Sequence, residues 1–237
     1  MRIVINDKEI IFPSSLSEIT LGQRINFQKQ YGDLLDKMLE SCQKMEDPEL
    51  REIELVMFQM EKMYATFAFF AGCTLEAIKE SEFVGRVAQI YSASLHLLFE
   101  EEENMELQSE FLWRGEEWEL AAPTLSNGSN MSFGELIQSK QLMQDMVALG
   151  RNRWDALQSL AAIYFRKKGE AYSDKLVEEG SERLALMLEL PMDYALQVGF
   201  FLSALMNSSV NILMSSENPG PSQRAVIRGG ILKRMAG

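Results

Sequence analysis

The residues of this 237-residue chain that most readily take part in catalysis or metal binding are His96, Cys42 and Cys73. A metal site needs several ligands, and a catalytic nucleophile needs a base beside it. His96 lies among leucines in an apolar stretch, and Glu100 is the one acid at a ligand-like spacing from it. We therefore expect a packed or partly exposed histidine and no metal ligand. The cysteines lie in apolar helical contexts and are expected to be reduced thiols, the alternative being a disulfide if their two helices touch.

An acidic run is the next candidate for chemistry, because residues 100–119 contain nine acids and one base, Arg114. Consecutive carboxylates on a helix point in different directions, and calcium loops need a glycine turn with spaced ligands. We expect a solvated face or a partner surface here. The sequence also has no glycine-rich phosphate loop and no G-x-S-x-G motif. These absences predict a protein that is not an enzyme and holds no metal or cofactor.

Charge is distributed unevenly along the chain, whose net charge is −12. Residues 217–237 carry four bases and one acid, a net +3, so the remaining residues carry −15. Nucleic-acid binding depends on basic contacts to phosphate, so we expect no nucleic-acid partner. The tail is predicted to dock onto an acidic surface of a neighbouring protein or of another copy, the alternative being a disordered end. Its predicted contact residues are Arg224, Arg228, Ile231, Leu232, Lys233 and Arg234.

Membrane insertion is not expected. The most apolar stretch, Ala195–Met206, has about 12 residues, fewer than the roughly 18–20 needed to span a bilayer. The N-terminus has charges within its first nine residues and no apolar run of signal-peptide length. The 46% hydrophobic content suffices for a packed core, and 195–206 is predicted to be a core helix.

The first half of the chain predicts a β-hairpin followed by helices. Residues 2–5 and 9–12 flank a polar Asn-Asp turn, and Pro13 ends the second strand. Helices are expected to about residue 30, over 34–44 beyond a break at Gly32, from Pro48 onward, and from near Ser81 into Glu100–Glu103. Met57, Met60 and Met63 form a stripe at helical spacing, which favours the core over an adaptable binding surface.

The second half repeats this theme. Residues 111–114 and 117–121 flank Gly115-Glu116 as a second hairpin, and helices are expected over 153–166, 173–189 and 192–215. The fold class is thus predicted as mainly α, a helical bundle with two small hairpins. Two related units, 1–109 and 110–216, would be followed by the tail 217–237. Chance similarity is the alternative to duplication.

Two tryptophans on the second hairpin, Trp113 and Trp118, are candidates for partner binding. Aromatic residues contribute much of the binding energy at protein interfaces. The alternative is that both indoles pack onto adjacent helices of the same chain.

The segment Pro13–Ile25, P-x-S-L-S-E-I-T-L-G-Q-R-I, resembles small proteins encoded in the tail and neck gene clusters of tailed bacteriophages, including crAss-like ones. Met131–Ile137, Trp154–Leu157 and Ala162–Arg166 have a similar character. The resemblance carries no catalytic residues. It implies a non-enzymatic structural component of the virion, in a neck, tail or baseplate, assembled in the host cytoplasm in many copies or with other virion proteins. The alternative is a tail assembly chaperone that binds an aggregation-prone tail protein and leaves.

Overall fold

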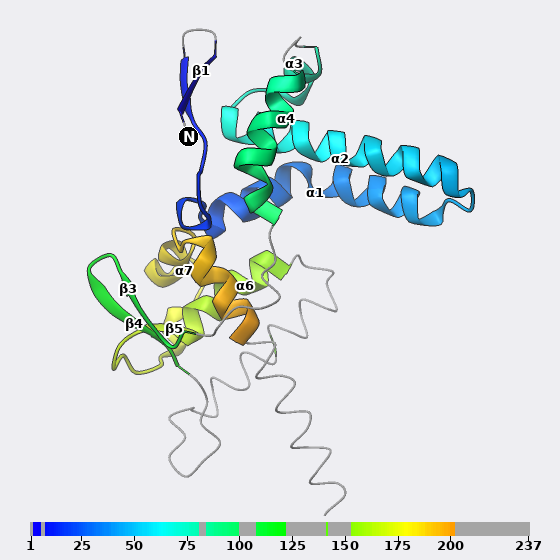
Figure 1. Ribbon diagram of the computed structural model, residues 1–237. Helices are drawn as coiled ribbons and strands as arrows, with labels where there is room; N and C mark the ends of the chain where they lie inside the picture. The colour runs from blue at the N-terminus through cyan, green and yellow to red at the C-terminus, as the bar shows by residue number, and fades with distance from the viewer. Residues whose placement is uncertain are drawn as a thin grey trace, which may run out of the picture. The chain divides into compact units, whose positions relative to one another are not determined.

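The computed structural model describes residues 2–5, 8–80, 84–99, 108–121, 141 and 153–201 (Figure 1). The chain divides into two compact units, Met1–Val198 and Gly199–Gly237. The described structure belongs almost wholly to the first. It is mainly helical with small antiparallel hairpins, which confirms the predicted fold class.

The N-terminal hairpin pairs β1 (Arg2–Ile5) with β2 (Lys8–Ile11), as predicted. Helix α1 then runs without interruption over Leu21–Lys44. It begins with a capping box, in which Thr20 and Gln23 each accept a backbone hydrogen bond from the other. The predicted break at Gly32 is wrong, because one glycine costs a helix only about 1 kcal/mol relative to alanine and 23 other residues propagate it.

Helix α2 (Pro48–Ala71) lies beside α1 and antiparallel to it (Figure 1). The Asp47 carboxylate caps its first turn, Pro48 takes the first helical position, and Gly72 ends it with a left-handed φ of 64°. Each of the two helices has 24 residues and is therefore about 36 Å long.

The shorter elements α3 (Leu75–Lys79), α4 (Val84–Ala93) and a 3-10 turn, Leu95–Phe99, follow and contact α2. Aromatic rings fill the space between them. Phe12 lies 5.1 Å from Phe67 between ring centroids, and Phe27 makes edge contacts with Phe69 and Phe99. This cluster packs the N-terminal strand, α1 and the second half of α2 together.

The second hairpin is also confirmed. It pairs β3 (Glu110–Trp113) with β4 (Glu116–Leu120) around Arg114 and Gly115, both at positive φ. A third strand, β5 (Phe165–Lys167), pairs with β4 and directly follows α6 (Arg153–Tyr164). The predicted helix over 153–166 therefore ends two residues early, because the backbone of 165–167 bonds to β4.

The predicted helix over 173–189 is wrong as a single element. The structure has a 3-10 turn over Asp174–Leu176 and then α7 (Glu182–Met187), with Gly180 at a positive φ of 80° between them. The helix predicted from Met192 is present as far as the described residues reach, to Phe201.

Duplication of the two hairpin-plus-helices units remains a prediction, because most of 122–152 lies outside the described residues. The described surroundings of the hairpins differ. β1–β2 has two strands and leads into two 24-residue helices, whereas β3–β4 gains β5 as a third strand. The predicted boundary between 109 and 110 lies inside the first compact unit.

Backbone hydrogen bonds join the start of α1 to a distant part of the chain. The Leu21 and Gly22 amides donate to the Leu190 and Leu188 carbonyls, both at 2.8 Å, and the Met192 amide donates to Ile19. The approach is so close that a Cβ on Gly22 would lie 2.7 Å from the Leu188 oxygen. Glycine is therefore required here by contact with another segment.

We expect Gly22→Ala to lower the free energy of unfolding by about 1–3 kcal/mol, because the added methyl group meets backbone. Gly85→Ala in α4 is the matched control, since nothing lies within 4 Å of its added Cβ. That variant should be neutral or more stable by about 0.4–1 kcal/mol. Urea denaturation measures the free energy of unfolding of both variants. Equal values for the two would contradict the requirement for glycine at position 22.

Candidate protein interaction site

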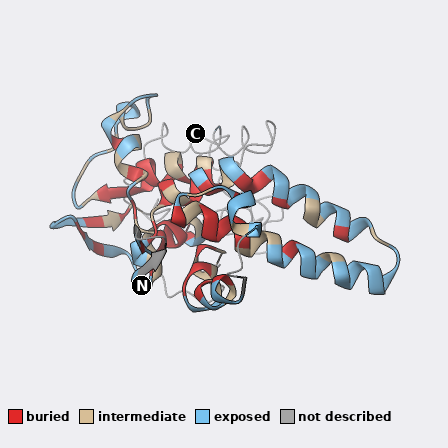
Figure 2. Ribbon diagram, turned by 90° about the horizontal axis from the view of Figure 1, so that it is seen from above, coloured by how far each residue is buried: buried red, intermediate tan, exposed pale blue. Residues whose placement is uncertain are grey.

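The first half of α2 carries an exposed apolar surface. Of the ten large apolar residues that are exposed in the described part of the chain, six lie here. They are Leu50, Ile53, Leu55, Val56, Met57 and Met60, and we call them the α2 face. Figure 2 shows the exposed colour along the ends of α1 and α2 that join through residues 45–47, while buried residues gather toward their other ends.

This face continues a stripe that is buried further along the same helix. Met57 and Met60 lie one heptad before Tyr64 and Phe67, so all four share one side of α2. Tyr64 and Phe67 are buried, and β2, α4 and the 95–99 turn contact this helix. Since α4 has ten residues and is about 15 Å long, it covers only part of a helix of about 36 Å.

The α1 side of the helix contributes little cover to this surface. Between Pro48 and Met63, Phe58 is the one buried residue of α2. This stretch spans just over four turns, and the described elements around it leave most of its apolar side chains exposed.

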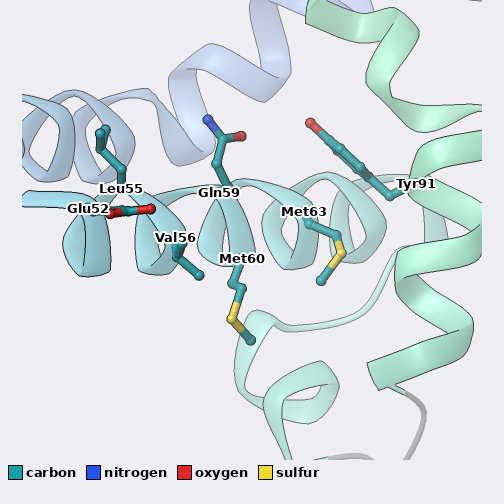
Figure 3. A pocket seen from close by; sticks show the side chains of 7 residues that line it. All are labelled: Glu52, Leu55, Val56, Gln59, Met60, Met63 and Tyr91. Carbon is teal, nitrogen blue, oxygen red and sulfur yellow. The ribbon is translucent and has the colours of Figure 1, made fainter.

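Two shallow grooves run along the α2 face. One, of about 390 Å³, extends from Glu52 past Val56 and Met60 to Met63 and to Tyr91 of α4 (Figure 3). The other, of about 420 Å³, is lined by Glu49, Glu52, Ile53, Val56 and Met57. Because they share Glu52 and Val56, they form one continuous surface.

Tyr91 lies at the inner end of this surface, on α4 beside Met63 (Figure 3). Burial raises the pKa of its phenol to about 12. The ring is thus neutral throughout the physiological range and adds an apolar wall to the groove.

The rim of the α2 face is acidic. Residues 46–54 contain five acids, and Arg51 is their one base. Its guanidinium donates to the Met45 carbonyl at 3.0 Å. Glu49 and Glu52 line the grooves and form no ion pair with any described residue. The surface is therefore apolar along its centre and acidic at its rim.

The core position predicted for the methionine stripe is wrong for Met57 and Met60. Both are exposed, Met57 by 53%, and Met63 is half-buried. Helical spacing shows which residues share a face, but it contains no information on how far neighbouring elements cover that face. The alternative of an adaptable binding surface is the one that fits the structure.

Trp113 and Trp118, predicted as partner-binding residues, lie in the core of their own chain. Trp118 is 1% exposed, stacks on Phe165 at 5.1 Å and donates its indole hydrogen to the Trp113 carbonyl. The Arg183 guanidinium lies over the same ring, 4.8 Å from the Trp118 ring centroid. Strand β5 explains this burial, because it supplies Phe165, which stacks on Trp118. The sequence patterns did not predict this strand. Neither indole is accessible to a partner.

The other predicted contact residues, Arg224, Arg228, Ile231, Leu232, Lys233 and Arg234, lie outside the described residues. The acidic run over 100–107 does too. Their roles stay predictions.

The candidates for chemistry form no catalytic group in the part of the chain that is described. His96 is half-buried, with Nδ1 3.2 Å from the Tyr91 carbonyl. Cys42 and Cys73 are free thiols, as expected. Within the described ranges, no three potential metal ligands lie together, and none of the helices has the length and apolar character needed to cross a bilayer.

Comparison of the chain with protein-family models, curated proteins and solved structures finds no match.

Polar substitutions on the α2 face should leave the isolated chain folded. We expect Ile53→Ser with Met57→Ser to change the free energy of unfolding by no more than about 0.5 kcal/mol each. Phe67→Ala on the buried part of the stripe is the control and should cost about 3–5 kcal/mol. Chemical denaturation tests this, and a loss at Ile53 and Met57 similar to that at Phe67 would mean the face is covered.

Trp118→Ala should lower the free energy of unfolding by about 3–5 kcal/mol, because the indole is packed on all sides. Leu112→Ala on the same hairpin is the matched control, since its side chain is 71% exposed, and it should change little. A Trp118→Ala variant as stable as the native chain would contradict this packing, and Trp118 would again be a candidate for partner binding.

Proposed function

We propose that this is a non-enzymatic protein acting through protein–protein contacts, as a structural component of a tailed-phage virion in its neck, tail or baseplate. The observation that carries the proposal is the α2 face, six exposed apolar side chains on one helix segment. Contiguous apolar patches with a polar rim are typical of interaction sites on soluble proteins. The resemblance of Pro13–Ile25 to phage tail and neck proteins supports the assignment to a virion.

The surface is suited to binding because little of it has to reorganise. The second half of α2 is anchored in the aromatic core, so the first half is presented on a long and regular helix. A helix with apolar residues at three- and four-residue spacings fits into a partner's groove or receives a segment along it. Several copies of the chain, or other virion proteins, would cover this face in an assembled particle.

A tail assembly chaperone is the second candidate. Met57, Met60 and Met63 favour it, because flexible methionine side chains adapt to apolar segments of varied sequence. Such a protein would occupy the same face with an aggregation-prone tail protein and would leave before the particle matures.

Mass spectrometry of purified particles of the encoding phage separates the two. We expect the chain in stoichiometric amounts relative to other tail or neck proteins. Its presence in infected cells together with its absence from mature particles would favour the chaperone. Absence of the chain from both mature particles and infected cells would contradict both functions.

The α2 face should be needed for incorporation. We expect Ile53→Ser with Met57→Ser to reduce the amount of chain per particle at least several-fold, because the loss of buried apolar area weakens the contact. Leu112→Ser is the control, since this exposed residue lies on β3, outside the α2 face. Equal incorporation of both variants would show that a different surface makes the contact.

A further inference from the structure

The acidic rim and apolar centre of the α2 face match one segment of this same chain. We propose that residues 224–234 of a second copy dock along the α2 face. This inference rests on the proposed function, in which copies of the chain assemble, and it names the contact between them.

The chemistry of the segment is complementary to that of the face. Residues 224–234 contain four bases, no acid and four large apolar residues. The apolar residues are Val226, Ile227, Ile231 and Leu232. On the α2 face, Glu49 and Glu52 alternate with apolar side chains and form no ion pair with a described residue. The apolar groups supply most of the binding, because exposed ion pairs contribute only about 0–1 kcal/mol each.

The segment is longer than the exposed part of the face. The exposed part of α2 from Leu50 to Met60 rises about 15 Å along the helix axis. An extended peptide covers that distance with about five residues, so an 11-residue segment has ample length to follow both grooves.

Symmetric pairing of one α2 face with another is disfavoured by charge. It would bring Glu49 and Glu52 of each copy toward the same acids of its partner, and like charges across an interface repel. The basic segment places opposite charges there instead.

The test measures self-association of the full chain by analytical ultracentrifugation. The native chain should associate reversibly, and more weakly as salt rises, because salt shortens the range of the charge attraction. The tail variant reverses the basic residues by Arg224→Glu, Arg228→Glu, Lys233→Glu and Arg234→Glu. The face variant carries Glu49→Lys and Glu52→Lys, and the control carries Glu178→Lys and Glu179→Lys on an exposed turn.

Each of the tail and face variants should associate about tenfold more weakly than the native chain. The control should associate normally, and circular dichroism should show all of them folded. The decisive sample is a mixture of the two reversed variants, in which tails and faces again have opposite charges. This mixture should recover association.

Three outcomes would overturn the inference: a native chain that stays monomeric, a face variant that associates as the native chain does, or a mixture that does not recover. The last would also result if the segment docked within its own chain. Failure here leaves the proposed function standing if Ile53→Ser with Met57→Ser still reduces incorporation into particles. Absence of the chain from particles would instead remove the virion proposal without altering the ultracentrifugation result.

Discussion

The first turn of α1 is the constraint on which the rest of the described structure depends. A helix begins with amide groups that lack partners inside the helix. Here the Leu21 and Gly22 amides bond to carbonyls some 170 residues away, and Gln23 is bonded to the Thr20 side chain. A second contact lies one turn further along α1. The buried Arg24 guanidinium is 4.6 Å from the centroid of the Trp154 ring on α6. The N-terminal end of α1 is thereby fixed to elements from the other half of the sequence.

The α2 face lies beyond the elements that cover the rest of α2. The aromatic cluster holds the first half of α1 and the second half of α2, whereas the opposite ends extend past the short helix α4. Burial of apolar surface there would need an element that the described chain does not place there. The acids around the face oppose direct pairing of two such faces, since like charges across an interface repel.

Local signals predicted the elements well where neighbouring residues decide the structure. Both hairpins, the start of α2 at Asp47-Pro48 and the helix after Pro191 followed from turn and capping chemistry. Predictions failed where distant segments decide. Strand β5 exists because β4 lies beside it, Trp118 is buried because β5 supplies Phe165, and Met57 is exposed because α4 is short. The predicted tail contacts lie outside the described residues.

The junction at the start of α1 also sets an order of events during synthesis. A ribosome adds about 5–20 residues per second, so Leu188 and Leu190 follow Gly22 by on the order of ten seconds or more. The α1–α2 pair makes contacts between neighbouring helices and is free to form during that interval. Its anchoring bonds at Leu21 and Gly22 form only when nearly 200 residues have been made. The hydrogen bonds that fix the start of α1 are therefore among the last contacts that this pair of helices can make during synthesis.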